Sequence, residues 1–155
     1  MKFSDFIVKG AVQPELKATG RDGALAELVT ALADAGALPK TAVEEIVAAL
    51  IKREKNGSTG FGKGVAVPHV KHPMVKTMVG TLGRSVHGID FAALDHQPVY
   101  SVVLLLSPEN QPQQHLQAMN IIFSSLQKDT FRKFLRQSTT REAIVDLLDE
   151  ADQGK

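Results

Sequence analysis

The segment 98-PVYSVVLLL-106 limits the folds open to this chain more than any other segment does. Its apolar residues run consecutively from Val102 to Leu106 instead of alternating with polar ones. A strand with this pattern is typical of a sheet that helices cover on both faces. The segment therefore predicts a layered α/β protein in which it forms a buried strand.

Apolar residues with helical spacing lie on both sides of this segment along the chain. Capping boxes, in which a threonine precedes a glutamate by three residues, mark two helix starts. Two further short runs resemble strands. The expected strands are 65–67, 77–82 and 98–106, and the expected helices are 22–35 closed by Gly36, one from the box Thr41-x-x-Glu44 to about Lys55, 116–126, 131–135, and one from the box Thr139-x-x-Glu142 to about Asp149.

The order of these elements favours a single domain. Two helices come first, several strands follow, and helices end the chain, without a repeat, a low-complexity tract or a Gly/Ser linker. We expect an α/β fold with α+β-like segregation, in which a mixed β-sheet is flanked by helices on both faces. The domain is predicted to span residues 1–150, and residues 151–155 are predicted to form a loose C-terminal tail.

Composition excludes several classes of function. The formal net charge of +1 provides no field for nucleic acid or an anionic membrane surface, and the chain contains no cysteine for disulfides, thiolate metal sites or nucleophilic thiols. No basic and apolar leader is present, and the longest apolar run is far shorter than a membrane span. We therefore expect a cytoplasmic protein without direct membrane insertion and without a nucleic-acid partner.

The glycine-rich stretch 57-GSTGFGKGVAVPHVKHP-73 resembles a phosphate-binding loop at first sight. It fits the first seven positions of the Walker A pattern, but Gly64 stands where a serine or threonine must reach magnesium. A predicted helix precedes it and a strand follows, which is the reverse of a P-loop. Two interpretations remain: a flexible helix-to-strand loop, or a loop whose amides bind another anion. Lys63 is expected to be a surface charge.

Among the five histidines, His69 has the most distinctive setting. It follows the predicted strand 65–67, and Pro68 before it stiffens the backbone at a sheet edge. His115 begins a predicted helix near the mouth of the sheet, where open α/β folds bind ligands. His69 and His72 have metal-ligand character, but no acidic residue or cysteine nearby completes a set. The other two, His87 and His96, lie in the turn-like segments 83–90 and 94–98 and are expected to be solvated.

No G-x-S-x-G elbow is present for a serine nucleophile, so a histidine nucleophile is the better candidate. An imidazole acting in this way needs one free nitrogen and a second nitrogen held as a donor. A phosphoryl group is its natural electrophile, and cationic or N–H donors must then hold the phosphate oxygens. The candidate donors, besides the amides of the glycine loop, are Arg53, His115, Ser58 and Thr59.

At this point the chain resembles a known family. The segment 53-REKNGSTGFGKGVAVPH-69 is similar to the enzyme IIA domain of the phosphoenolpyruvate-dependent phosphotransferase system, in its fructose, mannitol and nitrogen-regulatory (type 2) branch. The segments 88-GIDFAALDHQPV-99 and 107-SPENQPQQHL-116 resemble the same family in the same order. The resemblance covers nearly the whole chain.

The resemblance implies a phosphoryl carrier that needs no metal and no cofactor. His69 would accept a phosphoryl group from the histidine phosphoprotein HPr and pass it to a cysteine of a separate enzyme IIB, or would act as a phosphorylation-state signal. His115 would assist transfer, Arg53 would stabilise phosphate, and Ser58 and Thr59 would support phosphate binding. The family commonly has glycine where this chain has Val70, so Val70 and His72 could change how a partner reaches His69.

Three functions stay open on the sequence. The first is a phosphorelay component that serves sugar uptake. The second is a regulatory module of the nitrogen type, with no role in sugar transport, whose affinity for target proteins changes when His69 gains about two negative charges. The third is a relative of the fold that has lost phosphotransfer. The sequence does not identify the sugar, the target or the oligomeric state.

Overall fold

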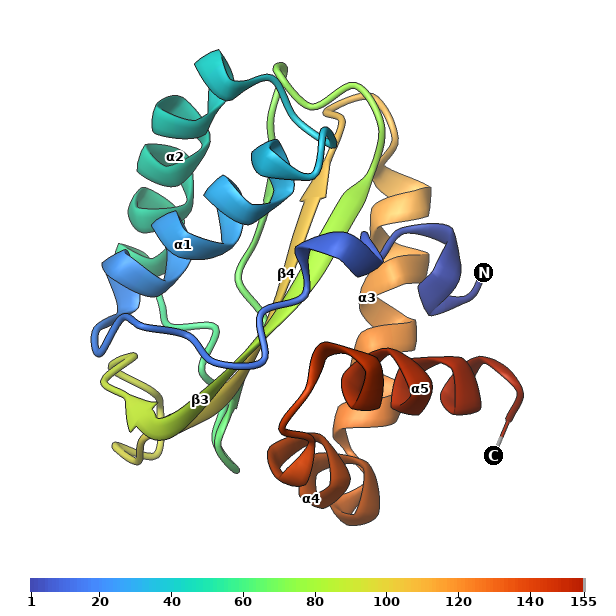
Figure 1. The fold of residues 1–155 in the computed structure, drawn as a ribbon. Helices are drawn as coiled ribbons and strands as arrows, with labels where there is room; N and C mark the ends of the chain where they lie inside the picture. The colour runs from blue at the N-terminus through green and yellow to red at the C-terminus, as the bar shows by residue number, and fades with distance from the viewer. Residues whose placement is uncertain (155) are drawn as a thin grey trace.

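The computed structural model describes residues 1–154, and its centre is a four-stranded mixed sheet (Figure 1). The long strand β4 lies in the middle, pairs antiparallel with β3 on one side, and pairs parallel with β1 and β2 on the other. The predicted mixed sheet is therefore confirmed. The strands are β1 (Val65–Ala66), β2 (His69–Lys71), β3 (Val79–Ile89) and β4 (Val99–Ser107).

Strands β1 and β2 are one edge strand interrupted by a proline. Val65 pairs with Ser101 and His69 pairs with Leu105, with no shift in register between the two pairings. Pro68 lies in the gap and has no N–H to donate. His69 was expected just after a strand end, but it is the first residue of β2 and is held by the sheet itself.

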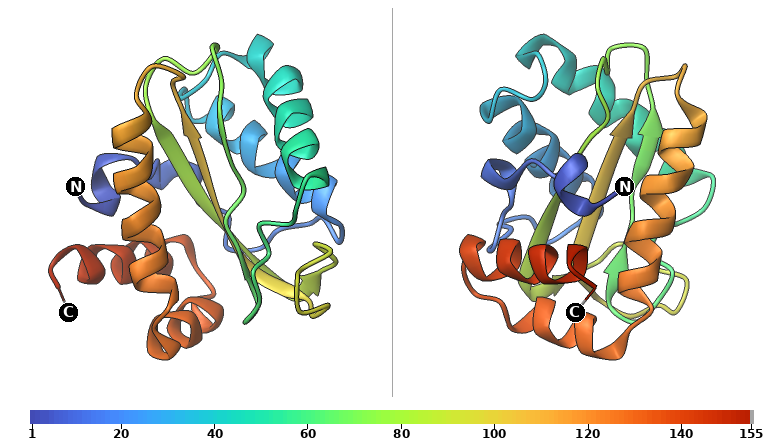
Figure 2. Two further views of the ribbon diagram at one scale, coloured as in Figure 1. Left: turned by 180° about the vertical axis from the view of Figure 1, so that it is seen from behind. Right: turned by 90° about the vertical axis from the view of Figure 1, so that its right-hand side faces the viewer.

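Helices cover both faces of the sheet, as the apolar run in β4 predicts. The helices α1 and α2 lie on one face, and α3, α4 and α5 lie on the other (Figures 1 and 2). Side chains of β4 alternate between the two cores: Val102, Leu104 and Leu106 pack toward α1 and α2, whereas Val103 and Leu105 pack toward the other three helices. The helices are α1 (Arg21–Asp34), α2 (Val43–Lys55), α3 (Pro112–Leu126), α4 (Asp129–Gln137) and α5 (Arg141–Asp152).

Both predicted capping boxes need correction. Thr41 lies inside a short 3₁₀ turn (Lys40–Ala42) that leads directly into α2, and no side chain caps α2. The cap of α5 is Thr140, one residue later than predicted, and its hydroxyl accepts a hydrogen bond of 3.1 Å from the Ala143 amide. In each case a neighbouring threonine or turn offers an equally good start, so local sequence alone does not fix the boundary.

Strand β3 is longer than the expected 77–82. It continues to Ile89, so the interpretation of residues 83–90 as a turn is wrong. A Cβ atom on Gly83 would lie 2.8 Å from side chains of both Leu16 and Leu28. This glycine therefore permits close packing of α1 and the N-terminal segment on the strand, and it is not a turn residue. His87 is exposed at the end of β3, and His96 is exposed in the following loop, as predicted.

The C-terminal helix is tied to the N-terminus. The Asp152 carboxylate accepts hydrogen bonds from the amides of Phe3 (2.6 Å) and Ser4 (3.0 Å). The prediction of a loose tail is therefore wrong for residues 151 and 152, whereas Lys155 lies outside the described residues. Within residues 1–154, no helix combines the length and the apolar character needed to cross a membrane.

Candidate functional site

The structure brings His69 and His115 together, although 45 positions separate them in the sequence. Their ring centroids lie 5.6 Å apart at an angle of 51°. His69 opens β2 beside the C-terminal half of β4, and His115 lies in the first turns of α3, which follows β4 after a short loop. The site therefore forms where strand ends and a helix start converge, as expected for His115.

The ring of His69 is held in one tautomer by the main chain. Its Nδ1 lies 2.7 Å from the carbonyl oxygen of Val67. A carbonyl can only accept, so Nδ1 must carry the proton and donate it, which leaves a lone pair on Nε2. This is the arrangement that a histidine nucleophile requires.

The environment of His69 favours the neutral ring. Burial lowers its pKa below the ordinary value of 6.5, against the opposing effect of the hydrogen bond to Val67. The positive charges of Arg53 and Lys71 also lower the pKa of His69, whereas the carboxylate of Glu54 raises it. A neutral imidazole next to two cations suits the capture of an anionic electrophile.

His115 is more strongly held in its neutral form. Its side chain is buried, with 8% of the residue exposed, and its Nδ1 lies 2.6 Å from the hydroxyl of Ser107 at the end of β4. Burial, followed by the charges of His69 and Lys71, lowers the pKa of His115 to about 4. Because Ser107 occupies Nδ1, the position left for a second hydrogen bond on this ring is Nε2.

Arg53 lies in the last turn of α2 and is half-buried. One of its terminal nitrogens, Nη1, donates a hydrogen bond of 3.0 Å to the carbonyl of Gly57. A guanidinium has five N–H donors, so most of its donors stay available for phosphate oxygens. Lys71 is a second cation near both histidines, and its part in the site was not predicted because it depends on the pairing of β2 with β4.

The hydroxyls of Ser58 and Thr59 are engaged within the glycine loop. The Ser58 Oγ accepts the Gly60 amide at 3.0 Å and donates to the carbonyl of Phe91 at 3.4 Å. The Thr59 hydroxyl bonds the carboxylate of Glu54, which also accepts the Thr59 amide at 2.9 Å. Both side chains fix the shape of the loop, and their support of phosphate binding stays a prediction. Glu54 was missed because a glutamate in a helix is normally exposed, yet here it is 3% exposed.

Val70 does not obstruct His69. Successive residues of a strand point to opposite faces, and Val70 packs against the core under α1 and α2. His69 faces the other side of the sheet, toward His115 on α3. A glycine at position 70 is therefore not needed to expose the ring of His69. His72, two residues beyond Val70, accepts the Met74 amide at 3.1 Å, and among residues 1–154 no group of three or more potential metal ligands forms.

The structure is an α/β protein with a histidine at the edge of its sheet, and comparisons with known proteins identify its family. The family model described as "Phosphoenolpyruvate-dependent sugar phosphotransferase system, EIIA 2" matches residues 5–151. The chain belongs to this family of phosphoryl-transfer components.

The relatives include nitrogen regulatory proteins and a sugar-specific transport component. The chain is 37% identical over 148 residues to a nitrogen regulatory protein of Bradyrhizobium diazoefficiens, an alignment that covers 96% of this chain and 95% of that protein. It is 30% identical over 154 residues to the fructose-specific EIIABC component of Bacillus subtilis, which covers 99% of this chain but only 24% of the longer protein. Among solved structures, the nitrogen regulatory protein IIA-Ntr of Neisseria meningitidis aligns with a TM-score of 0.84 and 25% identity over 94% of this chain and 98% of that one.

Proposed function

We propose that the protein is a phosphoryl carrier that accepts a phosphoryl group from phospho-HPr on the Nε2 atom of His69. The observation that carries the proposal is the 2.7 Å hydrogen bond between Nδ1 of His69 and the Val67 carbonyl. It fixes the proton on Nδ1 and directs the Nε2 lone pair outward from the main chain. This transfer takes place in the cytoplasm, the compartment that the family resemblance implies.

The transfer balances without any further reactant. The Nε2 lone pair of His69 attacks phosphorus while the bond between phosphorus and the donor's histidine nitrogen breaks, and that nitrogen recovers its lone pair. The proton on Nδ1 stays in place. The phosphorylated ring then carries a positive charge, which the Val67 carbonyl stabilises through the same hydrogen bond.

Neighbouring groups support the equatorial oxygens during transfer. Arg53 offers a planar fork for two oxygens, and Lys71 adds a compact charge. In the neutral tautomer in which the Ser107 hydroxyl donates to Nδ1, His115 carries a proton on Nε2 and can donate it to a phosphate oxygen. We assign His115 to transfer and stabilisation, and Ser58 and Thr59 to the loop that shapes the phosphate side of the site.

The proposal is tested by incubating the protein with phosphoenolpyruvate, enzyme I and HPr. We expect one acid-labile phosphate per chain in the wild type and none in His69→Ala. His87→Ala is the matched control, because His87 is exposed on β3, and it should be labelled normally. Absence of label in the wild type with a competent HPr would refute the proposal.

For the step after phosphorylation, the relatives suggest two roles, which are transfer to an enzyme IIB and regulation of target proteins. A structure of the mannitol IIA of Escherichia coli in complex with phosphorylated enzyme IIB has this fold, with a TM-score of 0.76 at 19% identity. The nitrogen regulatory relative, in contrast, is 37% identical to this chain, against 30% for the fructose-specific relative. We favour the regulatory role on that basis. If phosphorylated and unphosphorylated protein capture the same partners from a lysate, and a sugar-specific IIB drains the label rapidly, the transport role is correct instead.

A further inference from the structure

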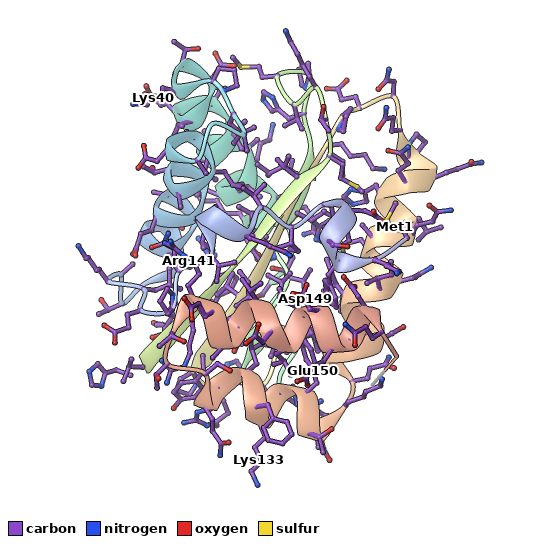
Figure 3. The ribbon with its side chains drawn as sticks, turned by 45° about the vertical axis from the view of Figure 1, so that its right-hand side comes forward. Met1, Lys40, Lys133, Arg141, Asp149 and Glu150 are labelled. Atoms are coloured by element: carbon purple, nitrogen blue, oxygen red, sulfur yellow. The ribbon has the colours of Figure 1, made fainter. Side chains whose placement is uncertain are left out.

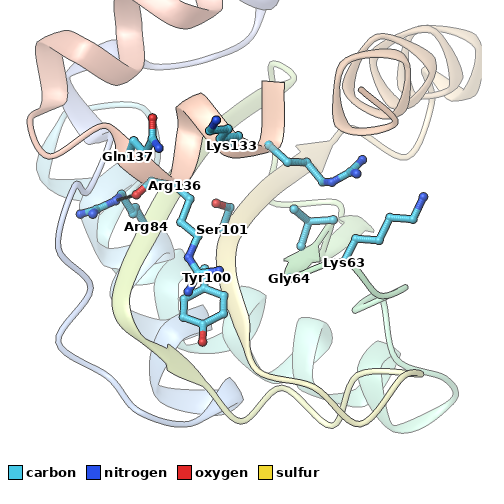
Figure 4. A pocket seen from close by; sticks show the side chains of 10 residues that line it. Lys63, Gly64, Arg84, Tyr100, Ser101, Lys133, Arg136 and Gln137 are labelled. Atoms are coloured by element: carbon cyan, nitrogen blue, oxygen red, sulfur yellow. Dashed lines mark hydrogen bonds between the residues drawn. The ribbon is translucent and has the colours of Figure 1, made fainter. Parts of the chain in front are cut away.

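A second concave site lies away from the two histidines. It is a cavity of about 590 Å³ between the glycine loop, the beginning of β4 and helix α4 (Figure 4). Lys63 of the loop and Arg84 of β3 lie on opposite sides, with Tyr100 and Ser101 of β4 between them. Helix α4 closes the cavity with Arg132, Lys133, Arg136 and Gln137.

The lining of this cavity is strongly cationic. Five of its residues carry a positive charge and none carries a negative one. Arg132 pairs with Asp129, whose side chain is 89% exposed. The other two ion pairs found within residues 1–154, Lys9 with Asp149 and Arg21 with Asp22, do not involve the cavity. With a net charge of only +1 on the whole chain, this concentration is local. A concave surface of one sign raises the local concentration of oppositely charged ligands.

Arg84 adds a buried positive charge to the wall of this cavity. It is only 8% exposed, and its hydrogen bonds go to main-chain carbonyls: Nε to Arg136 (2.6 Å) and Nη1 to Pro14 (3.2 Å). No carboxylate among the described residues 1–154 forms an ion pair with it. Buried charges in proteins are normally paired, because an unpaired one loses its hydration without compensation. The carbonyls that accept from Arg84 satisfy its N–H groups but carry no negative charge, so its positive charge adds to the attraction of an anion into the cavity.

The other cations are arranged around the same space. Arg132 and Arg136 are four residues apart, so they share one face of α4. The guanidinium of Arg136 lies 3.5 Å from the centroid of the Tyr100 ring, a stacking contact that restricts the side chain before any ligand binds. Lys63, with a positive φ of 60° between Gly62 and Gly64, lies on the opposite wall. Pre-positioned guanidinium groups suit phosphate oxygens in particular.

This cavity is distinct from the site at His69. His69 pairs with Leu105 of β4, whereas Ser101 lines the cavity, four residues earlier on the same strand. Four residues of strand correspond to about 13 Å. Neither His69, His115 nor Arg53 contributes to the lining.

We propose that this cavity binds a small phosphorylated metabolite that carries at least two phosphate charges. Its volume of about 590 Å³, enclosed by cationic side chains from the glycine loop, β3 and α4, favours a small molecule over an acidic protein surface. In this proposal Lys63, which the sequence predicts to be a surface charge, contributes to anion binding. It does not depend on phosphoryl transfer at His69.

The test is calorimetric titration of the unphosphorylated protein with inorganic pyrophosphate and, separately, with ADP, at low ionic strength. We expect saturable binding of one equivalent of pyrophosphate. In Lys133→Gln/Arg136→Gln, binding should weaken at least tenfold, since two charged donors are lost. Arg84 should stay in place in this variant, because it bonds the carbonyl of Arg136 and not its side chain. Tighter binding of ADP would support the proposal and assign a nucleotide as the source of the phosphates.

Two controls separate this site from alternatives. Lys2→Gln/Lys40→Gln removes the same charge elsewhere, since Lys40 lies at the opposite end of the molecule from Lys133 (Figure 3), and it should bind pyrophosphate normally. Arg53→Gln should also bind normally, although it would impair a phosphate site at His69. The proposal is overturned if wild type shows no saturable heat, if the Lys2/Lys40 control weakens equally, or if Arg53→Gln alone abolishes binding.

Discussion

The contact between Glu54 and Thr59 predicts a large and specific effect of a single substitution. The Glu54 carboxylate is 3% exposed and accepts both the amide and the hydroxyl of Thr59, which holds the start of the glycine loop to the end of α2. Glu54→Ala removes both acceptors and leaves the Thr59 amide buried without its partner. We expect the loop to lose its fixed position next to Arg53.

The magnitude follows from the two hydrogen bonds. Each bond to a charged group contributes about 1.5–3 kcal/mol, and part of this is recovered because the carboxylate no longer has to be buried. We therefore expect the free energy of unfolding to fall by about 2–4 kcal/mol in Glu54→Ala. In Glu54→Gln the loss should be about 1 kcal/mol, because the amide oxygen can accept from the Thr59 amide while its NH₂ group donates to the Thr59 hydroxyl.

Urea unfolding followed by circular dichroism measures these differences, and the rate of phosphoryl acceptance from HPr measures their consequence. Glu45→Ala is the matched control, because Glu45 is exposed on the same helix and its loss should change stability by no more than about 0.5 kcal/mol. If Glu54→Ala unfolds like this control, or if it accepts phosphate at the wild-type rate, Glu54 does not position the loop.

Three further predictions concern the site and the sheet. Arg53→Lys keeps the charge but loses the planar fork, so phosphoryl acceptance should slow about 10- to 100-fold in a stopped-time transfer assay; an unchanged rate would remove Arg53 from the site. Burial lowers the pKa of His115 to about 4 in the folded protein, against 6.5 in the unfolded chain, so the unfolded chain takes up this proton at a higher pH. The contribution of His115 to stability should therefore be lost as pH falls from 6.5 toward 4. An NMR titration of His115 that gives an ordinary pKa would contradict this. Gly80→Ala would place a Cβ 2.6 Å from the Leu104 carbonyl and should destabilise by about 2–4 kcal/mol in urea unfolding, whereas Gly10→Ala, with nothing within 4 Å, should not; equal effects would refute the packing argument.

The layered fold could be predicted because β4 is buried on both faces. Its run of consecutive apolar residues is typical of a strand covered on both faces, and its side chains alternate between the two cores as expected. The length of β3 could not be predicted. Gly83 and Gly88 resemble turn residues in sequence, yet Gly83 is required by the close approach of Leu16 and Leu28, which come from distant parts of the chain.

In the candidate site, too, local sequence predicts some residues, whereas others become part of the site only through contacts between distant segments. Pro68 and the preceding apolar residues single out His69 from local sequence. The helix start at His115 predicted a place near the mouth of the sheet, but only the resemblance placed it in the same site as His69, because the pairing of β2 with β4 decides which residues face the ring. Glu54 and Lys71 gave no signal, since ordinary charged residues become part of a site only when the tertiary structure buries or orients them.

The central claim is that Nε2 of His69 carries the phosphoryl group while Nδ1 keeps its proton. The direct measurement is NMR spectroscopy of the phosphorylated protein with ¹⁵N-labelled histidines, in which a one-bond coupling between ³¹P and ¹⁵N identifies the bonded nitrogen. We predict coupling to Nε2 of His69, with its Nδ1 still protonated against the Val67 carbonyl. Coupling to Nδ1 of His69, or to either nitrogen of His115, would contradict the account.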